Sequence, residues 1–241
     1  AADHGAQVLV RRDPQRGKGW ALDWAVSQID LRAYDAVAVI DADNLVDPDF
    51  FREMTRRLVD GARVLQGYDG IANPEETPLT RLISITSVMK NLLYNGGKAA
   101  LGLSPHLMGT GMVFRAETLA AHGWPSHSIV ENIEQSLLFL LAGERIEHVP
   151  EARVYAQEAA TFEQALPQRQ RWASGQAALS WRALHAVARG ITSWRWSLID
   201  AGADLLLPFR YSKLLYCTIA ALGICLAILP AASWTIALVA L

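Results

Sequence analysis

The chain has 241 residues, which is enough for one large domain with a smaller appendage. Its 22 basic and 24 acidic residues give a formal net charge of −2, so no basic field indicates binding to nucleic acid. Both cysteines, Cys217 and Cys225, lie in an apolar stretch and are expected to pack as small apolar side chains rather than form a disulfide or a metal site.

Short apolar runs alternate with helical patterns over the first 160 residues. Strands are predicted at residues 7–10, 36–40, 63–67, 111–115, 146–149 and 152–155. Helices are predicted to begin near residues 17, 48 and 131 and to cover most of residues 80–101. Because strands that alternate with helices form βαβ units, the predicted fold class is α/β, with a mainly parallel sheet flanked by helices.

Two glycine-containing segments are candidate ligand contacts. Lys18 and Gly19 open a predicted helix, whose first backbone N–H groups accept anions while the lysine adds positive charge. Gly109 and Gly111 flank Thr110 just before a predicted strand, and glycines there permit a ligand to approach the backbone closely. The residues themselves leave two alternatives open, a solvated loop and a tight turn.

An acidic motif follows the strand predicted at residues 36–40. Asp41 and Asp43 flank Ala42 at the carboxyl end of that strand, where ligands bind in open α/β sheets. Two carboxylates placed in this way can hold Mg²⁺ or Mn²⁺ while substrate phosphates complete the coordination shell. Aspartates also favour strand exits through local hydrogen bonds, so an ordinary turn is the alternative.

The helix predicted near residue 131 has an unusual first turn. Its apolar positions recur at helical spacing, as expected for a helix in the core. Yet Glu131, Asn132 and Glu134 all lie at its mouth. Acidic residues suit a helix N-terminus because the helix dipole is positive there. The same residues are also candidates for chemistry.

The segment "PQRQRWASG", residues 167–175, brings Gln168, Arg171 and Trp172 into one helical pattern. Arginine can neutralise a diphosphate, and tryptophan can stack on a sugar or a base. Residues 176–212 are rich in Trp, Leu and Ala with Arg interspersed, which predicts amphipathic helices in the headgroup layer of a membrane. Helices that simply pack on the domain are the alternative.

No charged residue occurs from Leu214 to Leu241. About 20 apolar residues, at ~1.5 Å per residue, cross a bilayer core, so a transmembrane region is predicted over residues 213–241. Arg210 and Lys213 precede it, and the positive-inside tendency places the preceding domain in the cytoplasm.

The order of these motifs resembles the membrane-bound family 2 glycosyltransferases, the group that includes the synthases of cellulose, hyaluronan and poly-N-acetylglucosamine. The likeness extends from about residue 5 to residue 172, and the apolar tail is consistent with it. It implies a GT-A type fold and the inverting transfer of a sugar from a nucleotide-diphospho-sugar to a lipid or glycan acceptor. Such an enzyme is expected at a bacterial-type inner membrane.

The resemblance also implies roles for individual residues. Asp41 and Asp43 would bind Mg²⁺ or Mn²⁺ between the two donor phosphates, with Lys18 and Gly19 near the diphosphate. The segment from Gly109 through Thr110 to Gly111 would border the acceptor. The remaining donor and acceptor contacts would come from Gln168, Arg171 and Trp172.

Asn132 departs from the family pattern, because it stands where the family has the aspartate that acts as general base. An amide has no ionisable group and cannot take a proton. Three explanations stay open: an inactivating change, replacement of the base by Glu131 or Glu134, or a family member that binds nucleotide-sugar or scaffolds a synthase without turnover.

A second departure is at the start, where the family's first nucleotide-binding strand is not recognised. The chain is therefore expected to be a fragment of a longer protein. We predict a catalytic domain over residues 1–175 that lacks N-terminal strands, amphipathic helices over 176–212 and the transmembrane region over 213–241.

Overall fold

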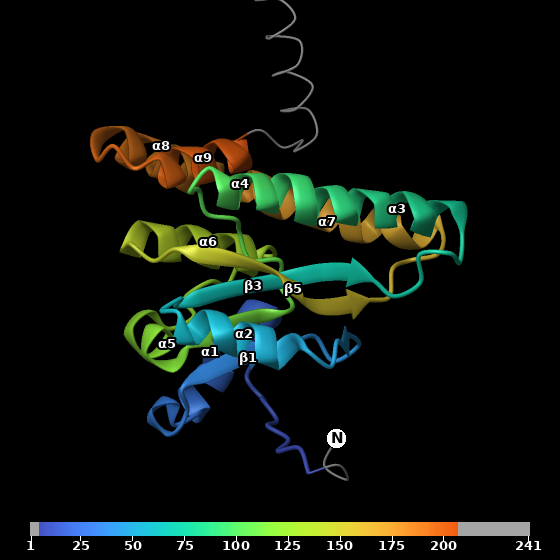
Figure 1. Cartoon of the computed structure of the whole chain (residues 1–241), viewed down its shortest axis with the longest axis horizontal. Coiled ribbons are helices and arrows are strands. Elements are labelled where there is room, and N and C mark those ends of the chain that lie inside the picture. Colours follow the sequence, from blue (N-terminus) through green and yellow to red (C-terminus); the bar gives the residue numbers. More distant parts are fainter. Residues whose placement is uncertain (1–4, 207–241) are drawn as a thin grey trace, which may run out of the picture. The chain divides into compact units, whose positions relative to one another are not determined.

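The computed structural model describes residues 5–206 and is built around a mixed five-stranded sheet (Figure 1). The spatial order of the strands is β1-β4-β3-β5-β2. Their bounds are β1 (Ala36–Val39), β2 (Leu45–Val46), β3 (Val64–Ile71), β4 (Met112–Arg115) and β5 (Ile146–Ala156). The pair β3–β5 is parallel, whereas β1–β4, β3–β4 and β2–β5 are antiparallel.

The α/β class is confirmed, but the prediction of a mainly parallel sheet is wrong. The apolar runs that predicted the strands report burial and carry no information on strand direction. The chain leaves β3 at one end of the sheet, passes through a long helical segment and re-enters β4 in the opposite direction. As a result, β4 separates β1 and β3, and each of those two strands pairs with it in antiparallel fashion.

Helices alternate with the strands and then follow them without interruption. In chain order they are α1 (Lys18–Gln28), the short 3₁₀ helix η2 (Leu31–Ala33), α2 (Phe50–Val59), α3 (Pro78–Met89), the π-helix η3 (Lys90–Asn95), α4 (Gly96–Ala100), α5 (Ala116–His122), α6 (Glu131–Ala142), α7 (Phe162–Ala178), α8 (Ser180–Thr192) and α9 (Trp196–Leu206). The helical segment predicted to cover most of residues 80–101 is helical as far as Ala100, with an unpredicted π-helical turn in its middle.

Apolar side chains cover both faces of the sheet. On one face, Leu65 of β3 packs against Phe50 and Met54 of α2. On the other face, the neighbouring residue Val64 packs in a cluster that contains Phe139 of α6 and, at its edge, Leu22 of α1. Because successive side chains of β3 point to opposite faces of the sheet, the strand contributes to two apolar cores. The second core holds α6 against the sheet.

A third apolar cluster joins α6 to the last two helices. Its members include Leu137 of α6, Ala183 of α8 and Leu205 of α9. Arg195, between α8 and α9, donates to the carbonyl oxygen of Leu140 at 2.7 Å. In Figure 1 the helices α3, α4, α7, α8 and α9 all lie on one side of β3 and β5.

A buried ion cluster also holds α9 in place. Lys98 of α4 is 7% exposed and lies 2.6 Å from Asp200. Its ammonium group also bonds Asp204, which accepts a hydrogen bond from Tyr94 as well. These contacts fix α9 against the segment formed by η3 and α4.

Four predicted strands differ from the structure. Residues 7–10 form no strand, and Val8, Leu9 and Val10 are exposed. The strand predicted at 36–40 ends at Val39, and this strand, β1, is only half-buried because it is the edge strand beside β4. The two short strands predicted at 146–149 and 152–155 are one strand, β5, with an irregularity in its pairing near Val149.

Within residues 5–206, no helix is both long enough and apolar enough to cross a bilayer. The transmembrane region predicted over 213–241 lies outside the described residues, and so does the end of the predicted amphipathic segment.

Candidate functional site

A lysine and an aspartate from two separate elements meet at the centre of the site. Lys18, the first residue of α1, pairs with Asp41 at the carboxyl end of β1. The Lys18 ammonium group also donates to the carbonyl oxygen of Gly109 at 2.7 Å. The start of α1, the end of β1 and the loop before β4 therefore meet at the Lys18 ammonium group.

The loop before β4 is bound to the loop after β1 through the Thr110 hydroxyl. This oxygen accepts hydrogen bonds from the Asp41 backbone N–H at 3.2 Å and from the Asn44 side-chain amide at 2.7 Å. Gly109 and Gly111 have φ values of +101° and +62°, a region that favours glycine. The two glycines turn the chain so that Thr110 lies against the acidic motif.

A buried glutamine of β3 forms hydrogen bonds with the backbone of the same loop. Gln66 is fully buried; its amide nitrogen donates to the Thr110 carbonyl at 3.0 Å, and its amide oxygen accepts from the Met108 N–H at 2.7 Å. The Gln66 backbone carbonyl lies 3.2 Å from Nδ1 of His148, and burial lowers the pKa of that imidazole. In the sequence, the only indication of this role is a polar residue within an apolar strand.

Asn132 lies at the mouth of α6, beside residues 109–111, which we call the glycine loop. Its amide nitrogen donates to the Leu107 carbonyl at 2.7 Å. A side chain built on Gly109 would lie 3.8 Å from the Lys18 ammonium group and 3.9 Å from the Asn132 amide. Gly109 therefore separates Lys18 from the position at which the resemblance expects a base.

Glu131 is the ionisable group at this mouth that faces Lys18. It is 8% exposed, and desolvation raises its pKa. Its hydrogen bond to its own backbone N–H and the positive charges of Lys18 and Arg171 oppose that rise, while the charge of Asp41 adds to it. Glu131 therefore shares one electrostatic environment with residues from α1, the end of β1 and α7.

Glu134 has a different environment. One of its oxygens lies 3.1 Å from the Arg182 guanidinium group of α8, and the other accepts the Ser128 N–H at 3.0 Å. These bonds occupy both oxygens and tie α6 to α8.

The three residues predicted from "PQRQRW" lie on α7. Gln168, Arg171 and Trp172 are all exposed, and Trp172 is 37% exposed. Further along α7, a side chain on Gly175 would meet Ile129, so α7 packs on the segment that leads into α6. Of the three predicted residues, Arg171 is the one whose charge acts on Glu131.

The predicted metal ligands are two carboxylates that differ in exposure. Asp43 is exposed, whereas Asp41 is half-buried and bonded to Lys18. In the described part of the chain, no three acidic, histidine or cysteine side chains gather to form a metal site. Mg²⁺, however, is commonly held by one or two carboxylates together with substrate phosphates and water. The donor set at residues 41–43 fits that mode.

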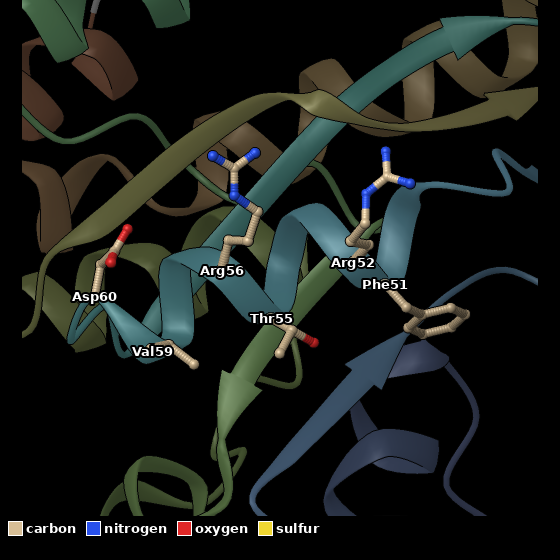
Figure 2. A pocket seen from close by; sticks show the side chains of 6 residues that line it. All are labelled: Phe51, Arg52, Thr55, Arg56, Val59 and Asp60. Carbon is tan, nitrogen blue, oxygen red and sulfur yellow. The ribbon is translucent and has the colours of Figure 1, made fainter.

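A hollow of about 530 Å³ occurs on the outer face of α2, away from these residues (Figure 2). It is lined by a single helix, with Arg52 and Arg56 on one side and Phe51 and Val59 on the other. Arg52 and Arg56 both pair with Glu53 of the same helix. The hollow contains none of the predicted site residues.

Two curated relatives resemble this chain at low identity. Glucomannan 4-beta-mannosyltransferase 1 of Oryza sativa subsp. japonica is 24% identical over 191 residues, which is 77% of this chain and 37% of the relative. The probable glycosyltransferase YdaM of Bacillus subtilis (strain 168) is 25% identical over 174 residues, which is 70% of this chain and 41% of the relative. The chain thus spans about two fifths of the length of these relatives.

The sequence also matches the model of a protein family. The family described as "Glycosyl transferase family group 2" matches residues 36–239, which include β1, the acidic motif, the glycine loop, α6 and α7. Lys18 and α1 lie before the matched region. The chain therefore belongs to glycosyl transferase family group 2.

Proposed function

We propose that this chain transfers a sugar from a nucleotide-diphospho-sugar to a glycan or lipid acceptor, with inversion at the anomeric carbon. The acceptor hydroxyl attacks the anomeric carbon, the bond to the diphosphate oxygen breaks, and the acceptor proton passes to a carboxylate. The similarity to a mannosyltransferase supports a hexose as the transferred sugar.

One observation carries this proposal: Lys18 and Asp41 converge on the glycine loop, and both interact electrostatically with Glu131. Lys18 and Arg171 supply positive charge for a diphosphate. The mouth of α6 lies on the other side of Gly109, where an acceptor would meet the donor. Positive and acidic groups thus flank one short stretch of backbone.

Glu131 is the side chain best suited to take the acceptor proton. Its burial and raised pKa bring its proton affinity closer to the working pH, which is what general-base catalysis needs. Glu134 is a poorer candidate because both of its oxygens are bonded to other groups. Asn132 would orient the loop rather than accept a proton.

A second candidate function is a catalytically impaired family member that binds nucleotide-sugar or scaffolds a synthase. The hydrogen bond from Asn132 to Leu107 favours it, because the side chain at the expected base position has a structural partner. Loss of a general base typically costs ~10²–10⁴-fold in rate, so this candidate predicts donor binding with very slow turnover.

A divalent cation is expected at Asp41 and Asp43, with Mg²⁺ and Mn²⁺ as the candidates. When bound, the ion would stabilise the negative charge on the departing nucleotide. Lys18, already paired with Asp41, would share that task from the α1 side.

Exposed apolar side chains support a membrane surface as a partner. On α3 and η3, Leu82, Ile85 and Leu92 are each more than half exposed. On and after α8, Trp181 is 80% exposed and Trp194 is 81% exposed. Groups of exposed apolar side chains are typical of interaction sites. Together with the uncharged sequence after Lys213, they favour attachment to a bacterial-type inner membrane with the catalytic unit in the cytoplasm.

A donor screen tests the proposed activity. The intact protein would be incubated with UDP-, GDP- and ADP-sugars, with Mn²⁺, Mg²⁺ or EDTA, and the released nucleoside diphosphate would be measured. We expect release with one class of donor, dependent on the metal. Tight metal-dependent binding of a donor without release would favour the impaired family member, and absence of both would overturn the proposal.

Membrane attachment is tested separately by flotation with vesicles. Trp181→Ser and Leu184→Ser change exposed positions of α8 and should reduce flotation of the protein. Val59→Ser, at an exposed position of α2, is the matched control and should not. Equal flotation of all variants would remove α8 as the membrane-facing element.

A further inference from the structure

A short segment before α6, residues 126–128, contacts α1 at Gly19, Trp20 and Asp23. A side chain on Gly19 would overlap the carbonyl oxygen of Ser126. The rings of Trp20 and His127 stack with centroids 3.6 Å apart and an interplanar angle of 3°. The Asp23 carboxylate lies 2.9 Å from Nε2 of His127.

The same segment is bonded to α6 on its other side. The Ser126 hydroxyl donates to the Gln135 amide oxygen at 2.6 Å. The Ser128 N–H donates to the Glu134 carboxylate at 3.0 Å. Residues 126–128 therefore bridge the helix that begins with Lys18 and the helix that begins with Glu131.

Apart from these contacts and the bonds of Lys18 to Asp41 and Gly109, helix α1 has few strong attachments. Gly19 is its single fully buried residue, and no side chain caps its N-terminus at Gly17. Leu22 and Val26 are only partly buried against the sheet. Because a helix held mainly by half-buried side chains can shift on its support, the contacts of His127 fix the position of Lys18 relative to α6.

We propose that His127 is a positioning residue for the donor site: stacked on Trp20 and bonded to Asp23, it sets the distance between Lys18 and the mouth of α6. This inference rests on the proposed function for its kinetic part. A diphosphate must reach the Lys18 ammonium group beside the glycine loop, so an unfixed α1 would weaken donor binding first. Helix α6 has its own apolar contacts with the sheet and with α8, so Glu131 would stay in place.

Residues 126–128 form what we call the bridge. Three variants separate the effect of the ring stack between His127 and Trp20 from that of the bond between His127 and Asp23. His127→Phe keeps an aromatic ring for Trp20 and removes the bond to Asp23. His127→Gln keeps a hydrogen-bonding side chain and removes the ring. Trp20→Leu removes the stack and leaves the His127–Asp23 pair in place.

His122 offers a matched control. It lies at the end of α5, is 3.0 Å from the Glu144 carboxylate and makes an edge contact with the Phe139 ring. His122→Phe thus removes a histidine–carboxylate bond of similar length whose partner, Glu144, belongs neither to α1 nor to the glycine loop.

The first readout is hydrogen–deuterium exchange of the backbone, which does not depend on turnover. Exchange in residues 18–24 and 126–131 should rise about tenfold in His127→Phe and Trp20→Leu and should not change there in His122→Phe. Unchanged exchange in both bridge variants would overturn the proposal, whatever the donor screen gives.

The second readout is the steady-state kinetics with the donor that the screen identifies. In His127→Phe the KM for the donor should rise about tenfold while kcat falls less than threefold, and His127→Gln should recover part of the KM. An equal fall of kcat in His127→Phe and His122→Phe would indicate a general loss of stability and would contradict a positioning role. If the screen finds no donor, the proposed function fails while the exchange data still decide whether the bridge exists.

Discussion

The side chain of Asn132 donates a hydrogen bond to the Leu107 carbonyl oxygen, 2.7 Å away, at the position where the family resemblance expects a catalytic aspartate. Leu107 is buried, and its own N–H is bonded to the Ser136 hydroxyl at 2.8 Å. An ionised aspartate at 132 could not donate to this carbonyl. The amide therefore holds the loop that leads to Gly109, whatever its part in the reaction.

Asn132→Asp separates the two candidate functions and should lower stability in either case. In an impaired family member, a base in the family position should increase the rate of donor cleavage by ~10²-fold or more, whereas an enzyme that uses Glu131 as its base should gain little. Loss of the bond to the buried Leu107 carbonyl should cost roughly 1–3 kcal/mol in the free energy of unfolding. Nucleoside diphosphate release and chemical denaturation measure the two effects. An unchanged rate would show that residue 132 is not the base position.

Glu131→Gln should abolish turnover and stabilise the fold near neutral pH. Burial raises the pKa of Glu131 in the folded state, so its favourable contribution to folding is complete below the unfolded pKa and is lost as the pH rises through the higher folded pKa. Removing the charge should then raise the free energy of unfolding by ~0.5–2 kcal/mol at pH 7 and change it little at pH 4. Denaturation at both pH values, with a rate assay, checks this.

Glu134→Gln is the matched control for that variant. It weakens the ion pair with Arg182 and the bond from Ser128, so it should lower stability at pH 7 instead of raising it. Its kcat should fall much less than that of Glu131→Gln. The reverse order of activities would assign the proton acceptor to Glu134.

Asp43→Ala should remove the metal dependence of nucleotide binding and leave stability unchanged, because Asp43 is exposed. Titration calorimetry with UDP and GDP in Mn²⁺ should show at least tenfold weaker binding. Asp60→Ala, which changes an exposed carboxylate on α2, should bind as the parent does. Equal affinity of the two variants would exclude Asp43 as a metal ligand.

Gln66→Ala should destabilise the protein and loosen the glycine loop. It leaves the Met108 N–H and the Thr110 carbonyl without their buried partner, at roughly 1–3 kcal/mol for each group. The thermal midpoint should fall and the donor KM should rise. Gln28→Ala, at an exposed position of α1, provides the control and should change neither quantity.

Gly19→Ala should be strongly destabilising, by about 1–3 kcal/mol or more, because the added methyl group overlaps the Ser126 carbonyl. Gly97→Ala makes the same change in α4, where nothing lies within 4 Å of the new atom, and should be neutral or slightly stabilising. Thermal denaturation compares them. Similar midpoints would mean that α1 does not pack on residue 126 as described.

The sequence predicted most of the elements because helical periodicity and apolar runs are local signals. It placed α1, α6 and α7 well enough to put Lys18, Glu131 and Arg171 on helices. Strand direction escaped it, because burial on two faces does not depend on direction. The strand predicted at 7–10 failed for a related reason, since an apolar run forms a strand only where a partner strand is present.

The supporting residues of the site were the part that sequence could not reach. Gln66, Asn44 and His127 act through partners 42 to 107 residues away in the chain. A lone polar residue in a strand or a turn has no periodicity that would identify such a role. The difference between Glu131 and Glu134 likewise came from Arg182 of α8, which no local pattern connects to α6.

The bonds from Arg182 to Glu134 and from Arg195 to Leu140 have a mechanical consequence. Both fasten α6 to the tryptophan-rich helices, one near its first turn and one near its last. If α8 is displaced, it would therefore rotate α6 with it and would not slide past that helix. Conditions that unsettle the tryptophan-bearing surface, such as a change of detergent or lipid, should then alter catalytic parameters before they unfold the sheet.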